Sequence, residues 1–234
     1  MRALRLHADR DLRLEDIPAP PPPAPGEVTL RIKAVALNHI DVWGFRGMAF
    51  AKREMPLIVG AEAVGEVVAV GDGVTDWKVG DRAAPYGALT CGKCRRCLAG
   101  QDNLCEDVRG VKGFHVGGFA CELVNQEARL LVRVPDGISW DDAACGAITF
   151  STVEHMLFDN AKLEKGETIL VHAAGSGIGT VAVRIAKDLG CTVIATAGDD
   201  AKCAKAKALG ADIVVNYSTQ NFPTVARRAT GKVG

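Results

Sequence analysis

Residues 168–189 read TILVHAAGSGIGTVAVRIAKDL, an apolar run followed by a glycine-rich loop and an amphipathic segment. The apolar run predicts a buried strand, and residues 180–189 predict a helix. Glycine lets the backbone turn tightly there, and the N–H groups at a helix start attract the negative charge of a pyrophosphate. The sequence therefore predicts a dinucleotide-binding loop made of Ala174, Gly175, Ser176, Gly177, Ile178 and Gly179.

A glycine-rich turn without a ligand is the alternative, because Ala174 and Ser176 stand where a strict G-x-G-x-x-G motif ending at Gly179 has glycine. The following segments favour the binding loop. They predict a second strand at 191–195, a helix at 201–209 and a third strand at 213–215. This β-α-β-α-β order indicates a parallel sheet with right-handed crossovers. A doubly wound domain has two such halves, so we expect a C-terminally truncated chain that carries only the first.

The end of the second strand bears on the choice of nucleotide. A carboxylate at the strand tip accepts a hydrogen bond from the ribose 2′-OH of NAD and repels the 2′-phosphate of NADP. The tip residue is Ala197, and Lys202 follows one turn later, which favours NADP(H) over NAD(H). Asp199 and Asp200 weigh against this preference unless they only begin the next helix, where acidic residues suit the helix dipole.

The first part of the chain is dominated by short strands and turns. Residues 18–25, PAPPPPAP, predict an extended polyproline connection that cannot donate to a sheet. Ser139 followed by Asp142 is typical of a helix start, and residues 141–158 carry helical spacing. We expect a compact all-β unit with strands at 3–6, 12–17, 28–33, 58–70, 82–86, 118–124 and 129–134.

Four of the eight cysteines lie within residues 91–105, CGKCRRCLAGQDNLC, at the spacing C-x2-C-x2-C-x7-C. Four thiolates this close in sequence can surround one Zn²⁺ tetrahedrally and leave no open coordination position. We therefore predict a structural zinc bound by Cys91, Cys94, Cys97 and Cys105. A [4Fe–4S] cluster is the main alternative. It is disfavoured because no proline follows the last cysteine and a nucleotide-binding unit is adjacent.

Composition limits the classes of partner. The 28 basic and 28 acidic residues of the 234-residue chain cancel, which gives no electrostatic case for nucleic acid or a membrane surface. The N-terminus is charged throughout, and no run approaches twenty apolar residues. The other cysteines show no pairing pattern, so we expect a cytoplasmic protein. The partner that we expect is a small-molecule substrate, not a nucleic acid or a membrane.

These features together resemble the medium-chain dehydrogenase/reductase superfamily, which includes zinc-type alcohol dehydrogenases and quinone oxidoreductases. The resemblance implies an α/β plus β fold: a GroES-like β-barrel catalytic domain over 1–155, then the first half of a Rossmann domain over 156–234. It also implies a homodimer or tetramer for full-length members. The matching segments are 36–43 (ALNHIDVW), 60–74, 79–84, the cysteine loop, 117–124, 134–144 and the glycine loop.

In the alcohol-dehydrogenase branch three residues hold a catalytic zinc, and this chain departs from that pattern. The matching positions are Asn38, Ala61 and, in the register that aligns Thr152 with the family threonine, Ile148. A second register would place Cys145 at the third position. Asn38, Ala61 and Ile148 offer no ligand suited to Zn²⁺. The open alternative is a site rebuilt from His39, Asp41, Glu62 and Cys145.

The resemblance therefore implies a reductase without catalytic zinc, which delivers hydride from NAD(P)H to an activated alkene, a quinone or an enoyl thioester. Its site would lie in the family's cleft, with Asn38 as amide donor to the developing oxyanion and Thr152 on the nicotinamide side. The catalytic candidates are Asn38, His39, Asp41 and Thr152, and Trp43 and Phe45 are candidate pocket residues. A zinc-dependent alcohol dehydrogenase with variant ligands and a non-catalytic fragment that binds structural zinc are the competing interpretations.

Overall fold

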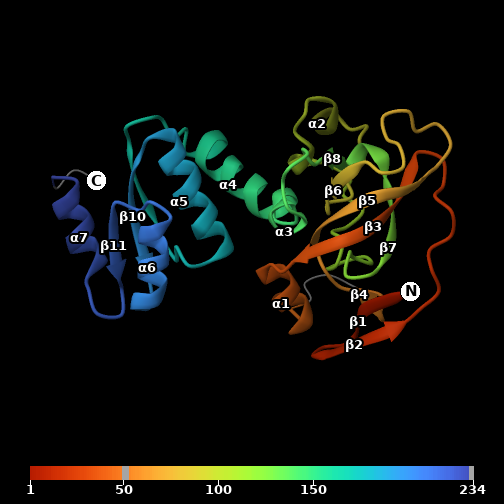
Figure 1. Ribbon diagram of the computed structural model, residues 1–234, viewed down its shortest axis with the longest axis horizontal. Coiled ribbons are helices and arrows are strands. Elements are labelled where there is room, and N and C mark those ends of the chain that lie inside the picture. Colours follow the sequence, from red (N-terminus) through yellow and green to blue (C-terminus); the bar gives the residue numbers. More distant parts are fainter. Residues whose placement is uncertain (49–52, 232–234) are drawn as a thin grey trace. The chain divides into compact units, whose positions relative to one another are not determined.

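A computed structural model describes residues 1–48 and 53–231 of the chain (Figure 1). Its contacts divide the chain into two compact units, Met1–Ile148 and Thr149–Gly234, which we call unit 1 and unit 2. The boundary expected from the sequence, 155/156, and the observed one both lie within the helical turns of residues 146–160.

Unit 1 is built from two antiparallel sheets. One has the strand order β7-β3-β5-β6-β8 and the other the order β2-β1-β4. The strands are β1 (Arg2–Ala8), β2 (Asp11–Asp16), β3 (Glu27–Ala36), β4 (Leu57–Ile58), β5 (Glu62–Val70), β6 (Arg82–Pro85), β7 (Leu123–Glu127) and β8 (Leu131–Arg133).

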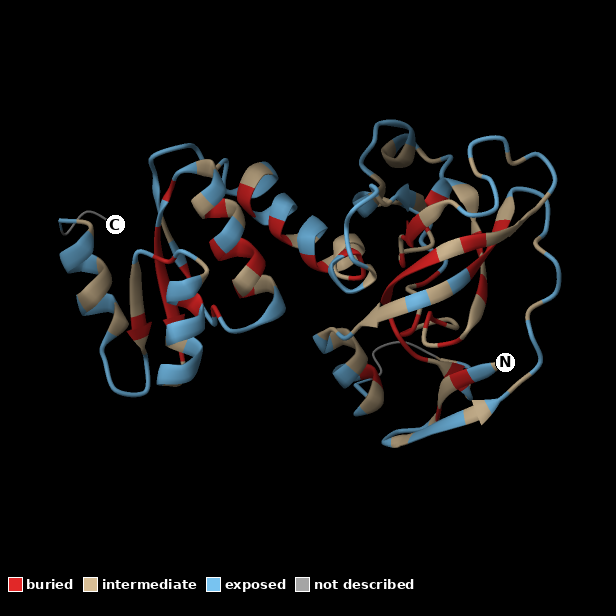
Figure 2. Cartoon of the chain, viewed as in Figure 1, coloured by how far each residue is buried: buried red, intermediate tan, exposed pale blue. Residues whose placement is uncertain are grey.

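The core of unit 1 lies between β3, β5 and the residues around Phe119 (Figure 2). Val28 and Leu30 of β3 are fully buried, as the alternation of apolar and polar residues predicts. Gly65 lets β5 approach β3 closely, because a Cβ there would lie 2.6 Å from the carbonyl oxygen of Arg31. This close pairing brings Glu62, at the start of β5, next to the end of β3.

Unit 1 also carries short helices: α1 (His39–Phe45), α2 (Arg95–Leu98) and α3 (Trp140–Ala143). Ser139 caps α3 by accepting a hydrogen bond from the Asp142 N–H at 3.0 Å, which confirms the predicted helix start. The helical run then continues as π turns at Gly146–Phe150, α4 (Ser151–Glu154) and further π turns at His155–Asn160.

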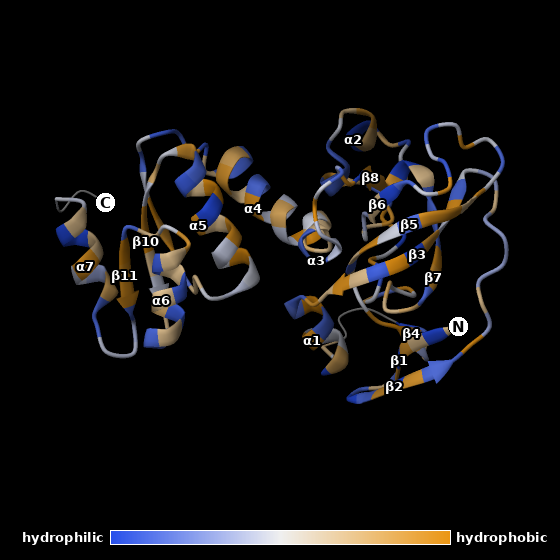
Figure 3. Cartoon of the chain, in the orientation of Figure 1, coloured by the Kyte–Doolittle hydropathy of each residue, from blue (hydrophilic) through white to orange (hydrophobic). Residues whose placement is uncertain are grey.

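Unit 2 contains a three-stranded parallel sheet of order β11-β10-β9, as the β-α-β-α-β pattern predicts. Its strands are mainly hydrophobic (Figure 3), and α5 packs its buried side against them. The elements are β9 (Thr168–Val171), α5 (Gly177–Leu189), β10 (Thr192–Ala197), α6 (Asp200–Ala208), β11 (Ile213–Asn216) and α7 (Phe222–Ala229).

Several expectations require correction. The strand expected at 58–70 is divided into β4 and β5, and the strand expected at 129–134 is shortened to β8 by a 3-10 turn at Ala128–Leu130. The strand expected at 118–124 begins later, as β7 at Leu123–Glu127, because residues 118–120 bond instead to β1 and to residues 58–60, at the end of β4 and just after it. The helix expected over 141–158 is not one regular α-helix but is interrupted twice by π turns. No helix in the described ranges has the length and apolar character needed to cross a membrane.

Candidate functional site

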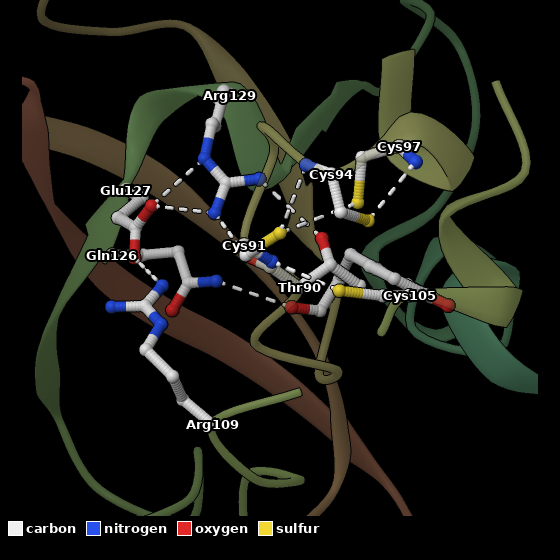
Figure 4. Close-up of polar contacts among 10 residues, drawn as sticks. Thr90, Cys91, Cys94, Cys97, Cys105, Arg109, Gln126, Glu127 and Arg129 are labelled. Carbon is white, nitrogen blue, oxygen red and sulfur yellow. Dashed lines mark hydrogen bonds and ion pairs between the residues drawn. The ribbon is translucent and has the colours of Figure 1, made fainter. Parts of the chain in front are cut away.

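The four cysteines of the 91–105 loop converge in unit 1 (Figure 4). Their Sγ atoms all lie within 4.8 Å of one another. Cys94 begins α2, and its sulfur accepts a hydrogen bond from the Cys97 N–H at 3.5 Å. The local fold of the loop thus gathers four sulfur ligands about one point.

Backbone N–H groups surround these sulfurs. The Cys91 N–H donates to Cys105 Sγ at 3.2 Å, and the Cys94 N–H donates to Cys91 Sγ at 3.3 Å. Such bonds favour thiolate, and the N–H of Cys97 is the main reason that the pKa of Cys94 is lowered to about 6. Loss of solvent around Cys97, followed by its thiol neighbours, raises the pKa of Cys97 to about 12. A cation between the four sulfurs would favour the thiolate form of each, because a metal ion deprotonates the thiols that coordinate it.

A Zn²⁺ ion fits this donor set. Tetrahedral zinc with Zn–S distances of about 2.3 Å places its sulfurs about 3.8 Å apart, close to the observed separations. Within residues 1–48 and 53–231, this is the one group that brings three or more potential ligands together. His39, Asp41, Glu62 and Cys145 form no such group.

A buried carboxylate, Glu62, is hydrogen-bonded to two of the three residues that the resemblance compares with ligands of a second metal. Glu62 is 0% exposed; it accepts from Asn38 Nδ2 at 2.8 Å and from the Ile148 N–H at 2.6 Å. The Ala61 N–H donates to Asp41 Oδ1 at 3.2 Å. The three positions compared with zinc ligands thus meet at two neighbouring carboxylates. In place of metal ligands they present an amide, a methyl group and an alkyl side chain.

The α1 helix positions the other catalytic candidates. Asn38 is its N-cap, and the Asn38 N–H donates to Asp41 Oδ2 at 2.8 Å. Burial raises the pKa of Asp41 despite these backbone hydrogen bonds, and the nearby Glu62 charge adds to the rise. His39 is exposed, and its ring centroid lies 6.1 Å from that of Trp43.

The glycine loop of unit 2 is shaped by close backbone contacts. Ser176 is the N-cap of α5 and accepts from the Gly179 N–H at 3.0 Å. A Cβ on Gly179 would lie 2.4 Å from the Ala173 carbonyl oxygen, so no other residue fits there. The Ala174 N–H donates to the Thr196 carbonyl at 2.8 Å, which ties the loop to β10. Strand, loop and helix form the arrangement that binds pyrophosphate at a helix N-terminus.

The segment after β10 faces this loop. Ala197 is buried at the end of β10, and Asp199 caps α6 by accepting from the Lys202 N–H at 2.8 Å. Lys202 Nζ also pairs with Asp199 Oδ2 at 2.8 Å. The Lys202 side chain lies against the loop, since a Cβ on Gly175 would be 3.0 Å from Lys202 Cδ. The aliphatic part of the Lys202 side chain therefore lies against the glycine loop, while its ammonium group pairs with Asp199.

Comparison with known proteins gives matches to both units. The family profile of the alcohol dehydrogenase GroES-like domain matches residues 24–136, and that of the zinc-binding dehydrogenases matches residues 177–234. The solved structure of an NAD-dependent alcohol dehydrogenase is 43% identical, with a TM-score of 0.93 over 100% of this chain and 68% of that chain. This chain belongs to the medium-chain dehydrogenase/reductase superfamily.

Curated relatives of this dehydrogenase/reductase chain include enzymes with different names. An alcohol dehydrogenase of Geobacillus stearothermophilus is 40% identical over 82% of the chain and 56% of the relative. A 2-haloacrylate reductase of Burkholderia sp. is 32% identical over 91% of the chain and 57% of the relative. The chain thus spans little more than half the length of these relatives.

Three residues of this superfamily member were missed by the sequence analysis. Thr149 is buried, and its Cγ2 would lie 3.7 Å from a Cβ on Gly177, so it borders the glycine loop one turn before Thr152. Tyr217 is 53% exposed, and its hydroxyl lies beside Gly198, just after β10. Arg129 contacts the residue before Cys91. Tyr217 and Arg129 become neighbours of these sites only through strand pairing, which sequence spacing does not reveal.

Proposed function

We propose that the protein is an NADP(H)-dependent oxidoreductase that reduces an activated alkene, a quinone or an enoyl thioester and holds zinc only in the cysteine loop. One observation carries the proposal: Glu62 is already bonded by Asn38 and Ile148 at the place compared with a catalytic zinc site. A reductase without a Lewis acid depends on orientation and on hydrogen bonds to the developing oxyanion.

The chain's residues have distinct roles in this proposal. NADPH supplies the hydride when it is bound. The hydrogen bond from Asn38 Nδ2 to Glu62 fixes the direction of the Asn38 amide. The second N–H of this amide is thereby preorganised to donate to the substrate oxygen on which negative charge develops. His39, exposed next to it, donates the proton that completes reduction. Asp41 holds the start of α1, and thereby Asn38, in place.

Two observations support NADP(H). The strand tip carries the small residue Ala197 where NAD-binding sites need a carboxylate. Lys202 lies against the glycine loop, and Tyr217 stands nearby, so a cation and a hydroxyl are at hand for a 2′-phosphate. Asp199 serves as the N-cap of α6 and pairs with Lys202.

A relative supports the substrate class. The 2-haloacrylate named for the Burkholderia reductase is an alkene conjugated to a carboxylate. Similarity to two alcohol dehydrogenases favours the second candidate, a zinc-dependent alcohol dehydrogenase with variant ligands.

Turnover assays separate the two candidates. The purified chain is mixed with NADPH and an α,β-unsaturated ketone, a quinone or a 2-haloacrylate, and the loss of reduced nicotinamide is followed with and without a chelator. We expect chelator-insensitive oxidation of NADPH, reduced at least tenfold in Asn38→Ala. Zinc-dependent oxidation of ethanol, with no NADPH oxidation by any of the three acceptors, would contradict the proposal.

A further inference from the structure

A polar network lies beside the cysteine loop on residues that are not metal ligands (Figure 4). Arg129 Nε donates to Glu127 Oε2 at 2.9 Å, and Nη2 lies 2.8 Å from the same oxygen. On its other side the guanidinium donates to Thr90, through Nη1 to the hydroxyl at 3.4 Å and through Nη2 to the carbonyl oxygen. Arg129 therefore joins the end of β7 to the residue before Cys91.

The Thr90 carbonyl and the Cys91 N–H belong to one planar trans peptide. They point in opposite directions, so a group that fixes the carbonyl also fixes the N–H. The Cys91 N–H donates to Cys105 Sγ at 3.2 Å. Arg129 at one end of this peptide therefore sets the direction of a hydrogen bond to a metal-binding sulfur at the other end.

Charge adds to this geometric effect. A cationic donor on a carbonyl polarises its peptide and strengthens the hydrogen bond that the N–H makes. Zn²⁺ with four thiolates carries a net charge of about −2, which such N–H donors and a nearby guanidinium stabilise.

The network is itself held in place. Glu127 also accepts from Arg109. Although burial raises the pKa of Glu127, the Arg109 hydrogen bond and the charges of both arginines bring it below its usual value. Gly92 has φ +70°, which glycine adopts without strain, and a Cβ there would lie 3.0 Å from Arg129 Nη1, so glycine leaves room for the guanidinium against the loop. Thr90 is 1% exposed.

We propose that Arg129 is a positioning residue for the zinc centre. It orients and polarises the Thr90–Cys91 peptide so that the Cys91 N–H donates to Cys105 Sγ, and this hydrogen bond slows zinc loss. Glu127 and Arg109 anchor it. The inference concerns the metal centre and does not depend on the substrate or the nucleotide.

Zinc release tests the proposal. The zinc-loaded chain is mixed with a chromogenic chelator, and the release rate is measured for wild type, Arg129→Met, Arg129→Lys and Arg133→Met. Substitution of a residue that orients metal ligands typically lowers metal affinity about 10- to 100-fold, so we expect release at least about tenfold faster in Arg129→Met. Arg129→Lys keeps the charge but cannot span both Glu127 and Thr90, and we expect release at least about threefold faster.

Arg133→Met is the matched control, because it also removes an arginine–carboxylate pair from unit 1. In this pair Arg133 Nη1 lies 2.9 Å from Asp81 Oδ2. Wild-type release rates in this control are expected. Equal acceleration in Arg133→Met and Arg129→Met would overturn the proposal, as would an unchanged rate in Arg129→Met. Wild-type behaviour of Arg129→Lys would reduce the effect to charge and overturn the positioning role.

Cobalt substitution supplies a readout that a merely structural role would not move. The thiolate-to-Co²⁺ charge-transfer band reports the hydrogen bonding of the sulfurs. We expect this band to shift in Arg129→Met and to stay unchanged in Arg133→Met, with one Co²⁺ bound per chain in both. An unshifted band in Arg129→Met would contradict the relay through the peptide.

Discussion

At the residue scale, substitution by alanine should have a large effect at one glycine of the nucleotide loop and a small effect at another. In Gly179→Ala the new Cβ would lie 2.4 Å from the Ala173 carbonyl oxygen, so the loop must shift. We expect a loss of about 1–3 kcal/mol in unit 2 stability and at least tenfold weaker NADPH binding. In Gly177→Ala the nearest neighbour is 3.7 Å away, and stability should change by less than about 1 kcal/mol.

Melting followed by circular dichroism and nucleotide titration check this pair. Equal stabilities of the two variants would contradict the role given to the close approach of the loop backbone at Gly179, because helix propensity alone favours alanine at both positions.

Asp199 offers a test of nucleotide preference. Asn caps helices as well as Asp does, so Asp199→Asn keeps the α6 start and removes only the charge that pairs with Lys202. Exposed pairs are worth up to about 1 kcal/mol, so we expect NADPH binding to tighten by up to about fivefold. Fluorescence titration with NADPH and NADH measures this, with Asp188→Asn as a control on the exposed pair with Arg184. Weaker NADH binding with unchanged NADPH binding would assign Asp199 to the ribose hydroxyls of NAD.

Glu62 is buried and hydrogen-bonded, so its substitution should lower stability far more than substitution of a surface glutamate on the same strand. Glu62→Gln puts an NH₂ group where two donors converge, which leaves buried polar groups without hydrogen-bond partners. We expect the free energy of unfolding to fall by about 1–3 kcal/mol. Urea unfolding is followed by tryptophan fluorescence, because Trp43, Trp77 and Trp140 all lie in unit 1. Glu66→Gln on the same strand, paired only at the surface with Lys33, should change stability by less than about 0.5 kcal/mol. Equal effects would contradict the role given to Glu62.

At the same scale, the zinc loop was predictable and the Glu62 cluster was not. The four cysteines are local, so their spacing alone predicts the site. Glu62 bonds Asn38 and Ile148 across sequence separations of 24 and 86 residues, and only strand pairing and the helical run bring them together.

At the scale of elements, Asp212 links three parts of unit 2. It accepts from Lys187 Nζ of α5 at 2.8 Å and from the Val193 N–H of β10 at 2.7 Å, just before β11 begins. The Lys187 hydrogen bond, followed by that of Val193, lowers the pKa of Asp212 from 3.8. A carboxylate whose pKa is lowered by folding stabilises the folded state above its unfolded-state pKa. This stabilisation is lost as the pH falls through the folded-state pKa.

Asp212→Asn should therefore lower the melting temperature of unit 2 at pH 7 but change it little in acid below the lowered pKa. Melting curves at both pH values check this, with Asp188→Asn again as the control. A loss of the same size in acid would show that Asp212 acts through packing and not through its charge.

Sequence patterns predicted most elements but missed others for physical reasons. The π turns at Gly146–Phe150 and His155–Asn160 keep the apolar spacing of an α-helix nearly intact, so spacing alone does not reveal them. Helix α7 was not predicted, although its sequence carries the signals of a helix start, Asn221 as N-cap and Pro223 in the first turn.

At the scale of the whole molecule, the candidate sites are divided between the two units. Unit 1 holds the cysteine loop and the Glu62 cluster, and unit 2 holds the nucleotide loop. Family membership follows from matches along both units. The proposed branch, without catalytic zinc, rests on three positions, Asn38, Ala61 and Ile148, whose side chains are not zinc ligands.

The metal content of the purified chain tests this account most directly. Elemental analysis of the zinc-loaded chain should give one zinc per chain and no iron. A Cys94→Ser/Cys97→Ser double variant should hold none, because the zinc lies in the cysteine loop alone. Two zinc ions per chain, or one that survives the double substitution, would contradict the central claim that Glu62, Asn38 and Ile148 leave no place for a catalytic metal.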